Sequence, residues 1–388
     1  MKFDFYLSEM SVSDKHGGGL TLQRILGDDL DDIAHFIHVN RFAADLPARN
    51  EFLKRSKDLL SVWESDFMRK LIGRSRASKI SMMLWAIQTR ANMAARKMAA
   101  IFNDKQVITG LVCPQGANAI FALEALKKRK KVKYITWVMD DHLVRYVDDR
   151  WQYPEGTEGV FARHLRGAEK VLVISPTMQR FYKERFGVVS TVLFGSSGLL
   201  QGAGQFEVKQ GSLKIGYFGA VAAWQKDALA AVAAALKGTD VQLDIYSGIE
   251  KLPAELEVDG LHFKGSVAPE LVLAHMQNYD AVLLPISFKQ KMRNMSEFNI
   301  ATKMSEYLAC GVPILAVGPA YAAMIAYLDE HDAAITVVST EENAIRDGFK
   351  YLRNPQLVAR ILKNAQKLVV DEVGSMPMRG VWQAVVNG

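Results

Sequence analysis

The sequence predicts an α/β protein built of two consecutive domains, each with a doubly wound parallel sheet. Short apolar runs alternate with helix-type segments along the chain, which is the pattern of parallel strands joined by covering helices. A stretch rich in Gly, Ser and Gln at residues 195–212 interrupts this alternation, which then begins afresh. The 388 residues suffice for two domains of ordinary size. We expect an N-terminal domain over residues 1–200, a C-terminal domain over 201–375 and a final helix over 376–388.

In the N-terminal domain, each expected strand is a short run of apolar and β-branched residues. These strands are expected at 3–7, 33–39, 107–112, 134–139, 171–174 and 191–194. The loop after the first strand contains Gly17, Gly18 and Gly19, and a helix is expected from Leu20. Residues 48–103 are expected to be mostly helical.

The C-terminal domain repeats the alternation of strands and helices. Its strands are expected at 213–218, 241–246, 261–263, 281–284, 314–317 and 335–338. Its helices are expected at 227–236, 269–278 and 302–310, from about residue 321, and again towards the end. The helix at 302–310 is the best delimited, because Gly311 and Pro313 follow it as they do at many helix ends.

The composition limits the class of protein. Apolar residues make up 49% and charged residues 23% of the chain, which excludes a globally disordered protein. Two cysteines, Cys113 and Cys310, cannot form a disulfide framework, and this favours a reducing compartment. No apolar run reaches the length of about 18 residues that a membrane span needs, and no signal-peptide pattern begins the chain, so we expect a cytoplasmic protein. The 8 histidines show no paired metal-ligand spacing, and we expect no metal ion.

Positive charge is concentrated in one segment. The whole chain carries a net charge of +6, whereas residues 51–133 hold 18 basic and 6 acidic side chains. This segment contains the basic run Lys127–Lys133 and an apolar stripe at helical spacing. The stripe consists of Ile80, Met83, Leu84, Ile87, Ala91, Ala94, Met98 and Phe102. Two interpretations stay open: the segment binds an anionic membrane surface, or its helix packs in the core and its cations are solvated.

The segment 299–316 carries the clearest chemical signal. It combines a loop, a helix N-terminus with Thr302 and Lys303, and a carboxylate at Glu306. The N–H groups and the positive dipole end of such a helix favour an anion such as a diphosphate, and Lys303 adds a cation. Glu306 can accept hydrogen bonds from two ribose hydroxyls. The alternative is an ordinary capped helix whose Glu complements the dipole.

Three glycines that follow predicted strands favour the binding interpretation. Gly219, Gly248 and Gly265 would all lie at the carboxyl edge of one parallel sheet, where ligands of doubly wound folds bind. Glycine also lets the backbone approach a ligand closely.

At this point the sequence resembles the glycosyltransferases of the GT-B fold. Five motifs occur in that family's order, namely Lys214–Ala220, Asp244–Gly248, Leu261–Val267, Asp280–Pro285 and Thr302–Leu308. The resemblance implies two Rossmann-like domains that face each other across a cleft. It further implies that the C-terminal domain binds a nucleotide-sugar donor and that the N-terminal domain binds most of the acceptor.

The resemblance also implies roles for individual residues. The donor-site residues are Gly219, Lys226, Gly248, Gly265, Ser266, Val267, Arg293, Thr302, Lys303 and Glu306. Among them, Glu306 would hold the ribose hydroxyls, Thr302 with Lys303 would hold the diphosphate, and residues 265–267 would lie along the base. In the N-terminal half, Gly17–Gly19 resemble a loop near the donor phosphate and the acceptor. The final helix would return to the first domain.

Two departures from the family pattern leave the stereochemical outcome open. Phe298 replaces the acidic residue that many retaining members place eight positions before the ribose Glu, although Glu297 adjoins it. Small residues replace an Arg after the first strand of the second domain, while Lys226 can serve as the neighbouring Lys. The negative charge of the diphosphate would then be balanced by Lys303, by the N-terminus of the helix and by cations of the preceding loop. These cations are Lys289, Lys291 and Arg293.

Transfer of a sugar to a hydroxyl requires stabilisation of the leaving group and, for inversion, a base beside the acceptor. The first candidates are Asp140, Asp141 and His142, which follow a predicted strand and can shift one another's pKa. A helix-capping Asp beside a solvated neighbour is the structural alternative. Asp14 and His16, which flank the glycine-rich loop, are the second choice.

We therefore expect a hexosyl- or deoxyhexosyltransferase that moves a sugar from a nucleotide-diphosphate-sugar to a hydroxyl of a glycan or lipid-linked acceptor. The nucleotide sugar is a co-substrate, and no cofactor is expected. Because of the basic segment, we expect the enzyme to act at the inner face of the cell membrane, in polysaccharide or glycolipid assembly. A non-catalytic GT-B subunit of a glycan-assembly complex is the alternative. Binding of nucleic acid is disfavoured, because aromatic residues are not interleaved with the basic ones.

Overall fold

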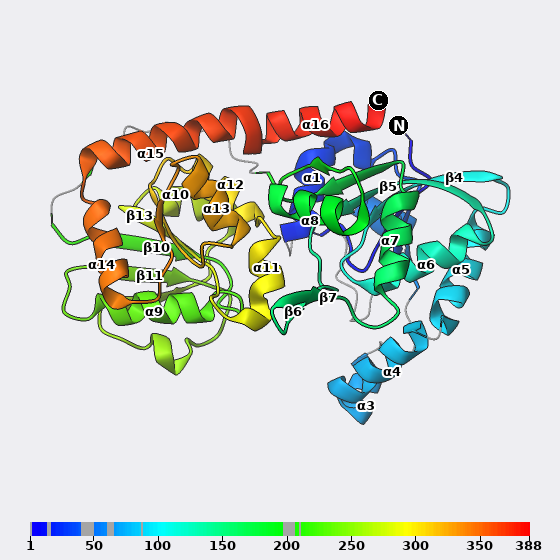
Figure 1. The fold of residues 1–388 in the computed structure, drawn as a ribbon, viewed down its shortest axis with the longest axis horizontal. Coiled ribbons are helices and arrows are strands. Elements are labelled where there is room, and N and C mark those ends of the chain that lie inside the picture. Colours follow the sequence, from blue (N-terminus) through cyan, green and yellow to red (C-terminus); the bar gives the residue numbers. More distant parts are fainter. Residues whose placement is uncertain are drawn as a thin grey trace. The chain divides into compact units, whose positions relative to one another are not determined.

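The computed structural model describes residues 2–13, 17–39, 50–59, 66–86, 88–196, 206–208 and 211–388. Its elements pack into two compact units (Figure 1). Unit 1 comprises Met1–Phe194 together with Arg379–Gly388, and unit 2 comprises Gly195–Met378. Each unit is built on its own parallel sheet with helices packed against it, which confirms the predicted α/β class.

The described part of unit 1 contains a parallel sheet in the order β3-β2-β1-β4-β5-β8-β9. Its strands are β1 (Phe5–Ser8), β2 (His35–His38), β3 (Ser56–Asp58), β4 (Val107–Cys113), β5 (Lys131–Val138), β8 (Lys170–Val173) and β9 (Thr191–Val192). Phe5 lies opposite His35 on one side and Gly110 on the other. A Cβ atom at position 110 would lie 2.3 Å from the Phe5 ring, so only glycine lets β4 lie beside this aromatic side chain.

Helices surround this sheet, and a short hairpin follows β5. The helices are α1 (Gly17–Leu26), α2 (Asn50–Arg55), α3 (Asp66–Ile72), α4 (Arg74–Ala86), α5 (Thr89–Ile101), α6 (Ala117–Lys127), α7 (Glu158–Gly167) and α8 (Pro176–Phe186). The antiparallel hairpin consists of β6 (Arg145–Val147) and β7 (Arg150–Gln152). Asp148 and Asp149 join its strands with φ angles of 50° and 55°, as a tight two-residue turn requires.

The apolar stripe between Ile80 and Phe102 belongs to two helices rather than to one. Gln88 adopts a left-handed φ of 61° and separates α4 from α5. The stripe residues of α5 and the residue after it are buried in the core of unit 1, namely Ala91, Ala94, Met98 and Phe102. The core interpretation therefore holds for α5, whereas Met83 on α4 is exposed. Ile87 lies outside the described residues.

Residues 48–103 are mostly helical, as expected, and the short strand β3 is the exception among their described residues. Its three residues, Ser-Lys-Asp, are polar and lie at an edge of the sheet, where no apolar pattern is needed. The ring Nδ1 of His38 on β2 lies 2.9 Å from Oδ1 of Asp58 on β3. This polar pair joins the two strands where apolar side chains are absent.

The described part of unit 2 contains a parallel sheet in the order β12-β11-β10-β13-β14-β15. Its strands are β10 (Lys214–Phe218), β11 (Gln242–Tyr246), β12 (Leu261–Gly265), β13 (Ala281–Pro285), β14 (Ile314–Val317) and β15 (Ile335–Val337). Residues of β13 and β14 are buried throughout, as expected of central strands covered on both faces. The helices α9 (Lys226–Leu236) and α14 (Glu342–Tyr351) pack together and join the strands in the core of the unit (Figure 1).

The remaining helices of unit 2 follow the strand ends or lead to the C-terminus. They are α10 (Val272–Met276), α11 (Arg293–Glu297), α12 (Thr302–Ala309), α13 (Ala323–Glu330), α15 (Pro355–Leu368) and α16 (Ser375–Asn387). The last ten residues of the chain, within α16, pack on unit 1. There Trp382 Nε1 donates to Asp29 Oδ2 over 2.6 Å, and Arg379 Nε donates to the Arg24 carbonyl over 2.8 Å.

Both sheets reverse their strand order at one point. The chain builds outwards from β1 to β3 and then returns to β4, and unit 2 does the same from β10 to β12 before β13. In such sheets the connections after the two central strands diverge, which leaves a crevice at their carboxyl ends. The ends of β10 and β13 are therefore where a ligand of unit 2 would lie.

Candidate functional site

Helix α12 lies across the carboxyl end of β10. The Phe218 N–H donates to Tyr307 Oη over 3.0 Å, and Tyr307 Oη donates back to the Phe218 carbonyl, 3.2 Å away. Both residues are buried, so these two hydrogen bonds hold the helix at the point where the strand order reverses. Ser305 Oγ makes a further bond of 2.7 Å to the Gly195 carbonyl.

The ammonium of Lys303 is held against Gly219, the residue that follows β10. A Cβ atom at position 219 would lie 2.1 Å from Lys303 Nζ, and the backbone there has a φ of 150°. Lys303 Nζ donates to Tyr217 Oη over 3.3 Å and lies 4.5 Å from the centre of the Tyr217 ring. A cation over an aromatic face is attracted by the ring. A side chain at position 219 would therefore displace the Lys303 ammonium from this place.

Burial sets the charge state of this cation. Desolvation lowers the pKa of Lys303 to about 8, and the nearby carboxylate of Glu306 acts in the opposite direction. A buried ammonium that loses hydration without full compensation is stabilised by any anion that binds beside it. The Lys303 site is thus prepared for a negatively charged ligand.

The N-terminus of α12 adds to this positive potential. Its N-cap residue is Ala301, which has no side chain able to cap the helix. Thr302 and Lys303 begin the helix, and Glu306 lies one turn further along, on the face of Lys303. Backbone N–H groups, an ammonium and a carboxylate therefore follow one another over a single turn, in the order that a diphosphate followed by a ribose requires.

The predicted glycines lie along the same carboxyl edge. Gly248 is exposed just beyond β11, and Gly265 ends β12 with a φ of 73°. The Ser247 N–H donates to the Gly265 carbonyl over 2.7 Å, which joins these two strand ends. Ser266 is exposed and Val267 is half-buried directly after β12. The structure thus places the residues predicted to lie along the base next to one another.

Two other predicted donor-site cations are engaged by side chains of unit 2. Lys226 begins α9 and forms an ion pair of 2.7 Å with Glu255. Arg293 begins α11, pairs with Glu297 and lies 4.5 Å from the centre of the Tyr321 ring. Phe298 is buried where many retaining enzymes have an acid. Lys289 and Lys291 are exposed at the turn that precedes α11.

In unit 1, the carboxylates of Asp140 and Asp141 differ sharply in environment. Asp141 is buried and accepts hydrogen bonds from the N–H groups of Leu143 and Val144, at 3.0 and 3.1 Å. Its other oxygen accepts from Tyr153 Oη over 2.8 Å and Tyr182 Oη over 3.0 Å. Burial raises the pKa of Asp141, while these hydrogen bonds oppose the rise. This carboxylate stabilises the segment that leads to the β6–β7 hairpin.

Asp140 and His142 remain accessible beside this buried group. Their side chains are 34% and 44% exposed, and His142 Nε2 lies 4.0 Å from Asp140 Oδ2. They follow β5 at the carboxyl edge of the sheet. This pair, unlike Asp141, is therefore accessible to a molecule from solvent.

The glycine-rich segment after β1 is partly helical. Gly17, Gly18 and Gly19 form the first turn of α1 rather than a loop. A Cβ atom at position 19 would lie 1.9 Å from the Ser13 carbonyl oxygen, so this glycine permits a close approach within unit 1 itself. Asp14 and His16 lie outside the described residues.

Glu9 is a residue at this edge that the sequence reasoning missed. Its carboxylate accepts hydrogen bonds from Gln115 N and Ala119 N at the start of α6, at 2.7 and 2.8 Å. Burial raises the pKa of Glu9, and these bonds oppose the rise. The N-terminus of α6 in unit 1 is therefore occupied by a carboxylate of the chain itself. By contrast, the N-cap residue of α12, Ala301, makes no side-chain capping hydrogen bond.

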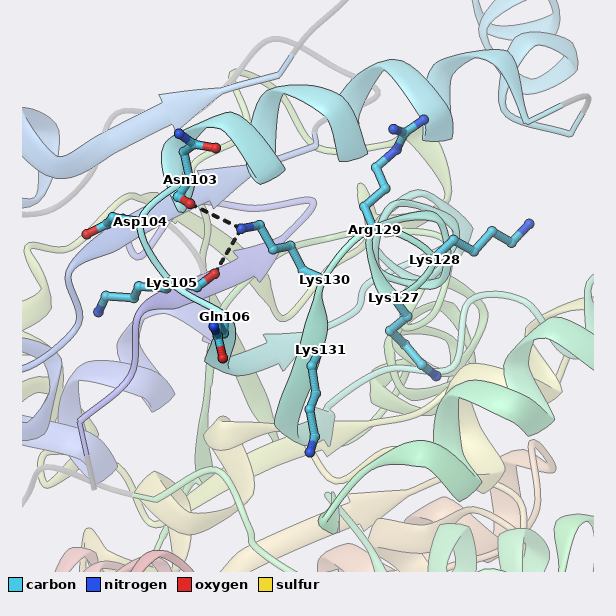
Figure 2. Close-up of a pocket in the computed structure, with 9 residues that line it drawn as sticks. All are labelled: Asn103, Asp104, Lys105, Gln106, Lys127, Lys128, Arg129, Lys130 and Lys131. Carbon is cyan, nitrogen blue, oxygen red and sulfur yellow. Dashed lines mark hydrogen bonds between the residues drawn. The ribbon is translucent and has the colours of Figure 1, made fainter.

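A pocket of about 560 Å³ lies at the opposite edge of the unit 1 sheet, where β4 and β5 begin (Figure 2). Its walls are residues 103–106 and 127–131, which include six cations. Lys130 Nζ donates to the carbonyls of Asn103 and Lys105, at 3.5 and 2.8 Å. Figure 2 shows the neighbouring cations pointing in different directions rather than towards a common point. Cations at the C-terminal end of α6 also complement its dipole, so this pocket does not form a converging anion site.

The described residues show neither a metal-binding cluster nor a membrane-spanning helix. They contain no group of three or more His, Cys, Asp or Glu side chains placed to hold a metal ion. None of their helices has the length and apolar character needed to cross a membrane. Both cysteines are buried and form no disulfide.

Known structures share this fold over the whole chain. No family model and no curated protein matches the sequence. Sucrose-phosphate synthase from Thermosynechococcus elongatus aligns with a TM-score of 0.70 at 13% identity, over 100% of this chain and 98% of its own. A glycosyltransferase from Rickettsia africae aligns with a TM-score of 0.66 at 12% identity, over 99% and 97%. HepE from Anabaena, crystallised with UDP and glucose, aligns with a TM-score of 0.62 at 13% identity over 100% of both chains. The chain therefore has the GT-B fold of nucleotide-sugar glycosyltransferases, as the sequence resemblance predicts.

Proposed function

We propose that the protein is a glycosyltransferase that moves a sugar from a nucleotide-diphosphate-sugar to a hydroxyl of a glycan or lipid-linked acceptor. The observation that carries this proposal is the buried Lys303 ammonium beside Gly219 and the start of α12. The fold supports it, since HepE of the same fold was crystallised with UDP and with UDP-glucose.

The proposed roles follow from the geometry of unit 2. Lys303 and the first N–H groups of α12 bind the diphosphate, and they stabilise the charge that develops on it when the sugar leaves. Glu306 accepts hydrogen bonds from the ribose hydroxyls. Because Lys303 is fixed over Tyr217 before the donor arrives, little reorganisation is needed during the transfer.

The acceptor is assigned to unit 1. Asp140 and His142 are the accessible acid–base pair at the carboxyl edge of its sheet, and they are proposed to accept the proton of the acceptor hydroxyl. The excess of basic residues in segment 51–133 supports an acceptor at an anionic membrane surface, as in cell-surface polysaccharide or glycolipid assembly. We assign the protein to the hexosyl- or deoxyhexosyltransferase class, at the inner face of the cell membrane.

One alternative has its own supporting observations. Phe298 is buried where retaining enzymes have an acid, and Asp141 is committed to structural hydrogen bonds. A non-catalytic GT-B subunit of a glycan-assembly complex would keep the nucleotide site and lack turnover. The two functions therefore differ in hydrolysis and transfer rather than in nucleotide binding.

A thermal-shift screen of nucleoside diphosphates tests the donor site. We expect one or more nucleotides to raise the melting temperature of the wild type and to have little effect on Lys303→Ala and Glu306→Ala. Lys350→Ala and Glu257→Ala are matched controls, because both side chains are well exposed in unit 2. Failure of every nucleotide to stabilise the wild type would refute the donor-site assignment.

A panel of nucleotide sugars then distinguishes an active transferase from a non-catalytic subunit. An active transferase slowly hydrolyses its own donor in the absence of acceptor, and Lys303→Ala should abolish this release. If a nucleotide binds but no sugar is released or transferred from any of the donors tested, the subunit function is favoured instead.

A further inference from the structure

Three consecutive helices of unit 1, α3, α4 and α5, have unusual exposed faces. Between Phe67 and Phe102 the sequence contains eight basic residues and no acidic residue. The stripe that the sequence pattern indicated is buried on α5, so it does not supply an exposed apolar surface there. Four large apolar side chains are exposed on the same three helices, namely Phe67, Leu71, Met93 and the stripe residue Met83 of α4.

Helix α3 has the clearest arrangement. Phe67 and Leu71 are 69% and 66% exposed and lie one turn apart. Lys70 is exposed beside Phe67, three residues further along, while Met68, three residues before Leu71, is buried. A helix that only packs against its own protein turns its apolar side chains inwards. Helix α3 instead leaves two large apolar side chains, Phe67 and Leu71, exposed one turn apart.

Helix α4 continues the pattern beside α3, against which it packs. Arg76, Lys79 and Met83 are exposed at intervals of three and four residues, so they share one face. Met83 is 55% exposed, whereas Trp85 on another face is buried. Figure 1 shows α3 and α4 extending beyond α5, away from the strands of the sheet. Cations and apolar side chains thus lie together on a protruding pair of helices.

We propose that α3 and the exposed face of α4 bind an anionic lipid bilayer. Phe67, Leu71 and Met83 enter the boundary between headgroups and acyl chains, while the cations around them contact lipid phosphates. Long basic side chains can keep their charges at the headgroups while their stems lie against apolar surface. This inference rests on the membrane location of the proposed function and names the surface of unit 1 that would bind the bilayer, whereas the sugar-donor site in unit 2 is tested separately.

Charge complementarity selects the bilayer over a second copy of the chain. A symmetric dimer through this face would bring two predominantly basic surfaces together, because Asp66 is the single acidic residue of helices α3 to α5. An anionic bilayer offers negative charge and an apolar interior at the same surface. It therefore matches both features that the helices expose.

Vesicle co-sedimentation of the full chain tests the proposal with three variants. Phe67→Ser with Leu71→Ser removes apolar area and keeps the charge, whereas Arg76→Ser with Lys79→Ser does the reverse. Each pair should lower the partition onto phosphatidylcholine–phosphatidylglycerol vesicles by about tenfold or more. Val189→Ser is the matched control, since Val189 is an exposed apolar residue elsewhere in unit 1. It should bind as the wild type does.

A fluorescent label reports insertion directly. Cys113 and Cys310 are buried, so a cysteine introduced by Leu71→Cys can be labelled selectively with an environment-sensitive dye. Addition of anionic vesicles should shift its emission to the blue, and the same dye on Val189→Cys should not respond. Vesicles of phosphatidylcholine alone should produce a much smaller shift at position 71.

Three results would overturn the proposal. The variants could bind vesicles as tightly as the wild type, or the dye at position 71 could remain in water while the protein sediments. Self-association without lipid that Phe67→Ser with Leu71→Ser abolishes would show that the face binds a second copy. The nucleotide thermal shift of each variant is measured in parallel, so that a loss of nucleotide binding is distinguished from a loss of vesicle binding.

Discussion

The pKa of Lys303 leads to a prediction about nucleotide affinity. The free protein holds this ammonium with a pKa of about 8, because burial removes its hydration. A bound diphosphate places negative charge beside it and raises that pKa. The group therefore favours binding while it is protonated, and this contribution is lost as the pH rises through the pKa of the free protein.

The size of the effect follows from the protonated fraction. With a pKa of about 8, roughly 90% of Lys303 is protonated at pH 7 and roughly 10% at pH 9. The dissociation constant of the nucleotide sugar should thus rise about tenfold between these two pH values, provided that the bound form stays protonated. Lys303→Arg keeps its charge over this range, and its dissociation constant should change much less.

Isothermal titration in buffers of different ionisation enthalpy measures the same coupling between nucleotide binding and protonation of Lys303. Near pH 8, wild-type protein should take up about half a proton for each nucleotide sugar bound. Lys303→Arg should take up almost none. An equal pH dependence in both proteins would refute the assignment of this proton to Lys303.

Three further changes test other parts of the structure. Gly219→Ala places a Cβ atom 2.1 Å from Lys303 Nζ, and isothermal titration should show nucleotide affinity weakened by about tenfold to a hundredfold as the cation is displaced. Asp141→Ala leaves the hydroxyls of Tyr153 and Tyr182 without their acceptor, and urea unfolding should show a loss of about 3 kcal/mol. Tyr307→Phe removes both bonds to Phe218, and unfolding should show a loss of about 1–3 kcal/mol with a weaker nucleotide thermal shift. Normal stability of either of the last two variants would contradict the proposed role of those hydrogen bonds.

The sequence predicts the strands and the donor edge well because their causes are local. An apolar run that ends in glycine marks both a strand and its carboxyl end, as at Gly219 and Gly265. The helix around Lys303 is likewise delimited by its own neighbours, Gly311 and Pro313. Parallel pairing then brings these separately recognised ends to one edge of the sheet.

Other features depend on distant residues and could not be found in this way. Asp140 and Asp141 are adjacent in sequence, and only the hydroxyls of Tyr153 and Tyr182 show which of them is structural. Lys303 is separated by 86 residues from Tyr217, the ring that supports it. The three polar residues of β3 form a strand because β2 has an available edge, and no apolar pattern marks it.

The attachment of the last ten residues to unit 1 has a consequence for synthesis. Trp382 bonds to Asp29, 353 residues earlier in the chain, so this contact forms only after all of unit 2 has been synthesised. Unit 2 is one continuous stretch of chain and can complete its contacts before that moment, whereas unit 1 has to wait for its final helix. The domain that is translated first is therefore the domain that finishes folding last.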